Sequence, residues 1–184
     1  MLMASLALAA AAVPATAQTE MLGVNVPDDF AIGYQARNDL LDMKEVVQPP
    51  ETVDNWTKLI TLQLIYGGAR RQSADAFYRR WQQDMRRACA GMTDTLVKGS
   101  VDGRPALRGA LSCPSNPQTG KPENLVAVLV QGEVNLMMVQ VAFRQPIGAA
   151  DTALINRIVG SLKVCDQRAL QSCSARRATG FVAK

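Results

Sequence analysis

The stretch LVAVLVQGEVNLMMVQVAF, residues 125–143, sets the fold class of this 184-residue chain. Two apolar runs, residues 125–130 and 134–143, are joined by the turn residues Gly132-Glu133. Runs of this length on either side of a glycine-containing turn predict two antiparallel strands that form a hairpin.

An earlier hairpin and a central strand are predicted on similar grounds. Residues 95–101 and 106–111 flank Asp102-Gly103, a pair that favours the tight turn of a two-residue hairpin. Residues 56–66 are apolar on both alternating faces, as expected for a central strand that is covered on two sides. Three shorter extended pieces are predicted nearer to the N-terminus: residues 22–30, which end in a Pro-Asp turn, the segment around Tyr34, and residues 40–47.

Two helices are predicted around these hairpins. The first covers residues 74–90, and Ser73 is a natural N-cap for it. Asp75 lies favourably in its first turn, and Gly91 can take the left-handed conformation beyond its end. Its apolar residues recur at helical spacing on the face that packs on a sheet: Phe77, Trp81, Met85 and Ala88 or Cys89.

The second helix follows the apolar hairpin, and Asp151 or Thr152 is its expected N-cap. Four apolar residues share one of its faces: Leu154, Ile155, Ile158 and Leu162. The order of strands, helix, two hairpins and helix predicts an α+β fold, in which a single mainly antiparallel β-sheet is flanked by helices. We expect one such domain, over residues 18–166.

The N-terminus predicts export. Residues 2–13 form an apolar, alanine-rich run, which is shorter than the about 20 residues that a membrane span needs. The small residues Ala-Thr-Ala follow, so we expect a signal peptide over residues 1–17 that is cleaved after Ala17. The first residues carry no Lys or Arg, and an uncleaved anchor is the alternative. The prediction is a periplasmic protein with no transmembrane span after cleavage.

All four cysteines lie after the predicted cleavage point: Cys89, Cys113, Cys165 and Cys173. An even number of cysteines in an exported protein favours structural disulfides, and four cysteines allow three connectivities. Of these we favour Cys89–Cys113, which would tie a helix end to the following hairpin, together with Cys165–Cys173, which would close a short loop.

The chain contains no histidine. This absence removes the Ser-His and Cys-His nucleophile pairs and the commonest transition-metal ligand. We therefore expect a protein that is not an enzyme and holds no cofactor and no metal. A hydrolase that works by Ser/Lys or carboxylate chemistry is the alternative.

The charges are segregated along the chain, which has 20 Lys and Arg against 16 Asp and Glu. Residues 20–54 hold eight acidic residues against two basic ones, whereas residues 70–87 are net positive. Residues 167–184 are predicted to be a basic, loosely ordered tail. This tail carries the whole excess of positive charge: Arg168, Arg176, Arg177 and Lys184.

The first predicted helix carries the candidate partner-binding residues: Arg79, Arg80, Arg86 and Arg87. They form two pairs seven residues apart, so each pair returns to the same side of the helix, and Arg70 and Arg71 precede them. Ordinary ion pairs such as Arg80–Asp84–Arg87 on a solvated face would explain them. The functional alternative is a surface that docks an envelope protein or complex with an acidic face, or anionic lipid headgroups. No aromatic stacking platform interleaves the arginines, so we expect no nucleic acid.

The opening strand ends in Pro27-Asp28-Asp29-Phe30, and the closing helix follows an apolar hairpin. With the order of the other elements, this pattern resembles the PsbP/DcrB-like α-β-α sandwich superfamily over residues 22–164. The segments VDNWTKLIT, residues 53–61, and CPSNPQTGKPE, residues 113–123, look like those of small exported proteins of alphaproteobacteria. Because members of the superfamily are mostly non-catalytic and share no active-site motif, the resemblance carries over no site residue.

These observations lead to one functional expectation and two alternatives. The resemblance and the predicted signal peptide imply a non-catalytic periplasmic binding or assembly factor of the bacterial envelope. The first alternative is a carrier of a small apolar ligand held between sheet and helix, and the second is the hydrolase without histidine.

Overall fold

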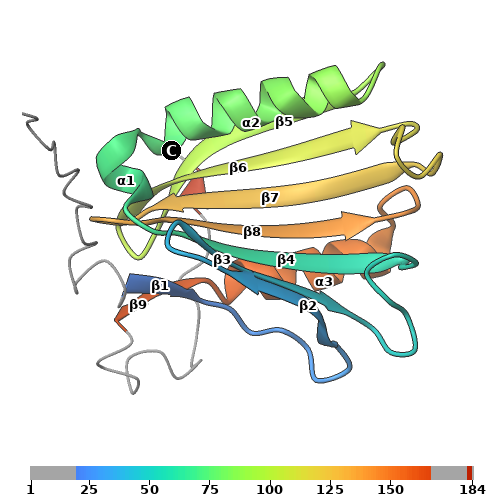
Figure 1. Cartoon of the computed structure of the whole chain (residues 1–184), viewed down its shortest axis with the longest axis horizontal. Coiled ribbons are helices and arrows are strands. Elements are labelled where there is room, and N and C mark those ends of the chain that lie inside the picture. Colours follow the sequence, from blue (N-terminus) through green and yellow to red (C-terminus); the bar gives the residue numbers. More distant parts are fainter. Residues whose placement is uncertain (1–19, 167–181, 184) are drawn as a thin grey trace, which may run out of the picture.

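The computed structural model describes residues 20–166 and 182–183, and these form two antiparallel sheets and three helices (Figure 1). The strands are β1 (Glu20–Gly23), β2 (Ala31–Arg37), β3 (Leu41–Val47), β4 (Lys58–Ile65), β5 (Thr93–Val101), β6 (Arg104–Cys113), β7 (Glu123–Gln131), β8 (Leu136–Phe143), β9 (Lys163–Asp166) and β10 (Val182–Ala183). The helices are α1 (Gly68–Arg71), α2 (Ala74–Ala88) and α3 (Ala149–Gly160). The predicted signal peptide lies outside the described residues, as does the predicted tail apart from β10.

The main sheet has eight strands in the order β10-β5-β6-β7-β8-β4-β3-β2, and every neighbouring pair is antiparallel. Both predicted hairpins, β5–β6 and β7–β8, are present, and β4 lies inside the sheet between β8 and β3. Asp102 and Gly103 form the first turn with φ values of 48° and 74°, the left-handed backbone that this turn requires.

The prediction of a single sheet is wrong at the start of the chain. β1 lies outside the main sheet and pairs with β9, a strand that the sequence did not predict. Residues 24–26, expected to continue the first strand, are not part of any strand, whereas the turn expected after Pro27 is present at Asp28 and Asp29. The physical reason is that Leu22, Val26 and Phe30 pack against the α3-side core of the main sheet instead of extending an edge.

The core lies in two layers, one on each face of the main sheet. Tyr78 of α2 packs with one layer, and Ile158 of α3 packs with the other, so helices cover both faces (Figure 1). Met137 and Met138, adjacent in β8, belong to opposite layers because successive strand residues point to opposite faces. The predicted α+β class with a helix-flanked antiparallel sheet is confirmed.

Two helix boundaries differ from the prediction. α2 begins as expected, with Ser73 Oγ accepting from Ala76 N at 3.2 Å, but it ends at Ala88 because Cys89 leaves helical geometry. α3 begins at Ala149, earlier than expected. Asp151 therefore lies inside the first turn, where its carboxylate accepts from the backbone amide of Gly148 at 3.1 Å.

The β7–β8 turn is longer than predicted, because β8 begins at Leu136 rather than at residue 134. Gly132 N donates to Asn135 O at 2.9 Å and closes the turn. The Glu20 carboxylate then accepts from the backbone amides of residues 133, 134 and 135, at 2.8, 3.1 and 3.0 Å. Since these amides bond Glu20, they are not available to extend the strand.

Candidate functional site

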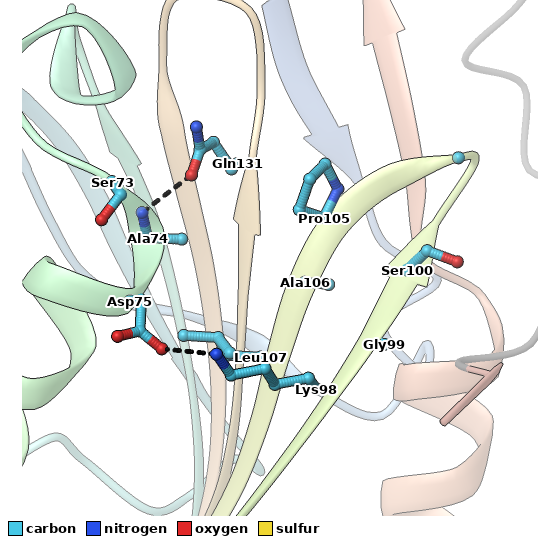
Figure 2. Close-up of a pocket in the computed structure, with 11 residues that line it drawn as sticks. Ser73, Ala74, Asp75, Lys98, Gly99, Ser100, Pro105, Ala106, Leu107 and Gln131 are labelled. Atoms are coloured by element: carbon cyan, nitrogen blue, oxygen red, sulfur yellow. Dashed lines mark hydrogen bonds and ion pairs between the residues drawn. The ribbon is translucent and has the colours of Figure 1, made fainter. Parts of the chain in front are cut away.

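A hollow of about 350 Å³ opens between the N-terminal end of α2 and the β5–β6 hairpin (Figure 2). Pro105, Ala106 and Leu107 of β6 form its apolar side. Lys98 and Ser100 of β5 contribute polar groups from the neighbouring strand. The hollow therefore combines an apolar floor with an ammonium and a hydroxyl group.

Asp75 organises the helix side of this hollow. Its carboxylate accepts from Arg79 Nε at 2.6 Å. It also lies 3.1 Å from Lys98 Nζ (Figure 2). The hydrogen bond from Arg79, followed by that from Lys98, holds the pKa of Asp75 below its usual range. The ion pair between Asp75 and Lys98 therefore links α2 to β5 across the hollow.

The first backbone amides of α2 are also occupied within the protein. Ala74 N donates to Gln131 Oε1 at 2.9 Å, and Ala76 N donates to the N-cap Ser73. The Lys98 side chain is 69% exposed. What the hollow presents to solvent is therefore a cation at its mouth and an apolar floor, rather than open helix amides.

The predicted partner-binding residues are all exposed on α2: Arg79, Arg80, Arg86 and Arg87. Arg79 belongs to the ion-pair network at the hollow, because it pairs with Asp75. Arg87 pairs with Asp84 one turn back, as expected, whereas Arg86 reaches Asp94 of β5. Arg80 has no ion pair with a carboxylate of the described residues, so the predicted Arg80–Asp84 pair is not formed. Arg70 and Arg71 lie exposed on α1 and continue the same positive stretch.

The cysteine pairing that we favoured is present for one pair. A disulfide joins Cys89, just beyond α2, to Cys113 at the end of β6, and both residues are buried. Cys165 is buried in β9. Cys173 falls outside the described residues, so the pairing of Cys165 with Cys173 stays a prediction.

A polar row crosses the α2 face of the sheet beyond the reach of the helix. Glu45 of β3 is in register with Thr61 of β4, which is in register with Gln140 of β8. Burial raises the pKa of Glu45, and the negative charge of Glu123 raises it further, whereas the hydrogen bond with Thr61 lowers it. Folding therefore makes the Glu45 carboxyl easier to protonate.

Sequence reasoning missed a second cluster, at the opposite end of the sheet from the hollow. The Arg144 guanidinium stacks over the ring of Trp56 at 4.0 Å and lies 3.2 Å from the Glu123 carboxylate. It also donates to Thr119 Oγ1 at 3.0 Å. The sequence did place Arg144 directly after an apolar strand, which could have marked it as a candidate. Trp56, however, comes close to Arg144 only because β4 pairs with β8.

Within residues 20–166 and 182–183, none of the helices has the length and apolar character needed to cross a membrane. A scan against protein-family models finds no match to this chain, and a search of curated proteins finds none either. One of the solved structures that match is a mutant of the protein Mog1, with 12% sequence identity and a TM-score of 0.48. The match covers 80% of this chain and 92% of that chain. A likeness of this size supports no statement about function.

Proposed function

We propose that the protein is a non-catalytic, exported factor that binds or assembles components of the bacterial envelope through the exposed arginines of α1 and α2. We call this surface the arginine face, and it consists of Arg70, Arg71, Arg79, Arg80, Arg86 and Arg87. The observation that carries the proposal is that all six guanidinium-bearing residues are exposed along two consecutive helices. Such a concentration of one charge attracts an acidic partner.

An acidic protein surface fits the arginine face better than a lipid surface does. Asp75, Asp84 and Asp94 bind three of the arginines, which fixes guanidinium positions and lowers the net charge. Fixed guanidinium forks suit bidentate pairing with carboxylates of a partner, whereas attraction to anionic lipid depends on total uncompensated charge. The large exposed apolar side chains also lie outside α2: Ile32, Tyr34, Leu40, Val97 and Ile147.

Two further observations support export to an oxidising compartment. The Cys89–Cys113 disulfide is of the kind that persists outside the cytoplasm. The predicted signal peptide and the resemblance to the PsbP/DcrB-like superfamily favour the same compartment and a binding role.

The test is site-specific photocrosslinking in intact cells. A photoreactive residue at Gln83, which is exposed between Arg80 and Arg87, is expected to capture one acidic envelope protein, and the same residue at Asn156 on α3 is the control. Reversing the two flanking charges, Arg80→Glu with Arg87→Glu, should abolish capture at Gln83 because repulsion replaces attraction.

Two results would contradict this function. One is capture at Gln83 that persists in the charge-reversed variant or matches capture at Asn156. The other is flotation of the purified protein with phosphatidylglycerol vesicles, but not with phosphatidylcholine vesicles, in the absence of any crosslinked protein. That outcome would assign the arginine face to a lipid surface instead.

A specific observation also favours the apolar-ligand alternative. A hollow of about 120 Å³ lies between β1 and the α3-side face of β3 and β4, with Leu22, Val24, Leu62 and Leu64 among its lining residues. The charged residues Asp42 and Lys44 also belong to its lining, beside these apolar side chains. Native mass spectrometry of protein purified from cells tests this alternative, and the expected result is a small co-purified apolar molecule that Leu62→Asp removes.

A further inference from the structure

The two edges of the main sheet are covered differently. At one edge, the β10 residues Val182 and Ala183 pair with Ser100 and Gly99 of β5. At the other edge, β2 pairs with β3 on its inner side and is the last strand of the described sheet. β2 has seven residues, so the described structure leaves a long row of edge backbone groups facing outward.

β2 also carries apolar side chains in solvent. Six of its seven residues are exposed, including Ile32 at 59% and Tyr34 at 45%. Leu40, at 60% exposed, lies in the turn that follows. Three of the five large exposed apolar side chains in the described part of the chain therefore belong to β2 or to the turn that follows it.

A bulge decides which way these side chains point. Ile32 is in register with Val46, and Tyr34 is in register with Glu45, so Gly33 is the extra residue between them. Because Val46 and Glu45 are consecutive in β3, Ile32 and Tyr34 lie on opposite faces of the sheet. A Cβ at Gly33 would lie 3.0 Å from Val53 Cγ1, so the bulge fits closely against its surroundings.

The bulge protects only the first half of the edge. Bulges commonly discourage pairing with another chain, as do Lys and Pro in an edge strand. β2 contains neither Lys nor Pro, and its second half keeps regular register with β3 from Tyr34 to Arg37. Four consecutive residues therefore offer an undistorted edge.

The charges at this edge are mainly negative. Asp28 and Asp29 precede β2 and Asp39 follows it, and all three are exposed. Arg37 is the exposed basic residue of the strand, and its Nε lies 3.8 Å from Asp42 Oδ2. An occupant that matches this edge needs basic groups towards both of its ends.

We infer that β2 is a docking strand for an extended, basic peptide segment of another protein, which adds a strand to the sheet beyond β2. Backbone pairing along residues 34–37 would supply affinity. Two adjacent apolar residues in the segment would point to opposite faces, beside Ile32 and Tyr34. Basic residues at its two ends would face Asp28 and Asp29 at one end of β2 and Asp39 at the other. This surface lies apart from the arginine face and has the opposite charge, so the two proposals fail independently.

The probe is a fluorescein-labelled nonapeptide with two central valines and two lysines at each end, titrated with the full-length protein and followed by fluorescence anisotropy. We expect saturable binding that weakens with added salt, because the end charges contribute. Replacing the lysines with glutamates should weaken binding at least about tenfold. Alternate N-methylation of the peptide backbone should have a similar effect, because it removes the amides that pair with the edge.

Matched variants locate the site on the protein. Ile32→Ser with Tyr34→Ser should weaken binding about tenfold and leave folding intact, since both side chains are exposed. Val97→Ser, at an apolar residue of β5 that is 43% exposed, is the control and should bind as the wild type does. Amide exchange of residues 34–37 should slow when the peptide is bound.

Three results would overturn the inference. The first is no saturable binding, and the second is equal binding of the N-methylated peptide or of the Ile32→Ser, Tyr34→Ser variant. The third is a dimer in sedimentation that the same double variant abolishes, which would make a second copy of this chain the occupant of β2.

Discussion

α2 and α3 cover the two faces of one sheet, but their side chains are buried to different depths. In α3, Ile155, Ile158 and Val159 are buried among aliphatic side chains of the sheet. In α2, only Ala74 and Tyr78 are buried, although the helix is three residues longer. α3 is therefore anchored mainly by fully buried aliphatic side chains, whereas α2 also relies on the half-buried Phe77, Trp81 and Met85, which pack against the core on its side of the sheet.

Polar and covalent contacts also hold α2 at its ends and along its flank. Gln131 and the Ser73 cap fix its first turn, and the disulfide from Cys89 fixes its last. Ion pairs from Asp75 to Lys98 and from Arg86 to Asp94 tie its flank to β5. Because these contacts hold α2 in place, the side chains on its outer side do not need to pack against the core. They can instead bind a partner, which is consistent with our proposal for the arginine face.

The largest expected effect tests the apolar anchoring of α3. Ile158→Ala should lower the free energy of unfolding by about 3–4 kcal/mol, because it leaves a cavity at a fully buried site. Met85→Ala on the sheet-facing side of α2 should cost only about 1 kcal/mol, since that side chain is half-buried. Urea unfolding followed by circular dichroism measures both values. Equal losses would contradict the contrast between the two helices.

The next largest effect tests the end anchoring of α2. Cys89→Ala with Cys113→Ala should cost about 3 kcal/mol, because the bridge closes a loop with a sequence separation of 24 residues. Native-state hydrogen exchange should then accelerate in the last turns of α2 and remain unchanged in α3. The wild type under reducing conditions is the control, and it should reproduce the pattern. Faster exchange spread evenly over both helices would refute a local anchoring role.

A smaller effect, of opposite sign, concerns the tyrosine that α2 buries. The Tyr78 hydroxyl is buried without a hydrogen-bond partner among the described residues, and burial, aided by the negative charge of Asp94, raises the pKa of Tyr78. Tyr78→Phe should therefore stabilise the protein by about 1 kcal/mol, because the unsatisfied group is removed.

The Tyr78 hydroxyl should also affect how the stability of the wild type depends on pH. Since the folded state holds this proton more tightly than the unfolded state, stability should fall as the pH rises above 10.0, and less steeply in Tyr78→Phe. Tyr34→Phe, at an exposed tyrosine, is the control and should change neither quantity. Loss of stability in Tyr78→Phe at neutral pH would show that the hydroxyl has a partner.

The features that the sequence predicted depend on local patterns. Asp102-Gly103 specified a turn through backbone conformation, and the spacing of Ile155 and Ile158 specified the buried side of α3. The Cys89–Cys113 pairing followed from the same element order. The first two signals each lie within a few residues, and the third joins a predicted helix to the predicted hairpin that follows it in the chain.

The features that were missed depend on contacts between distant segments. The Glu20 carboxylate binds backbone amides more than a hundred residues away, and no pattern near Glu20 indicates this. Arg144 and Trp56 meet because β8 pairs with β4, which is not its neighbour in sequence. The Arg80–Asp84 pair failed for the opposite reason, since correct helical spacing permits an ion pair without requiring it.

The smallest expected effect tests the polar row that α2 leaves uncovered. The folded state holds the proton of Glu45 more tightly than the unfolded state does, whose carboxyl keeps the ordinary pKa of 4.5. Stability contributed by this group is thus present below pH 4.5 and is lost as the pH rises through the folded pKa. Glu45→Gln should remove that loss and stabilise the protein at pH 7 by about 0.5 kcal/mol, a partly solvated group being worth less than a full pKa unit.

Urea unfolding at pH 4, 5.5 and 7 measures this dependence. The advantage of Glu45→Gln should grow from pH 4 to pH 7, and Asp39→Asn, at an exposed turn residue, should show no such growth. A Glu45→Gln variant that is less stable at pH 7 would mean that the hydrogen bond with Thr61 outweighs burial and the repulsion from Glu123. The polar row, in which Thr61 is buried, would then stabilise this part of the sheet, as apolar side chains do on the α3 face.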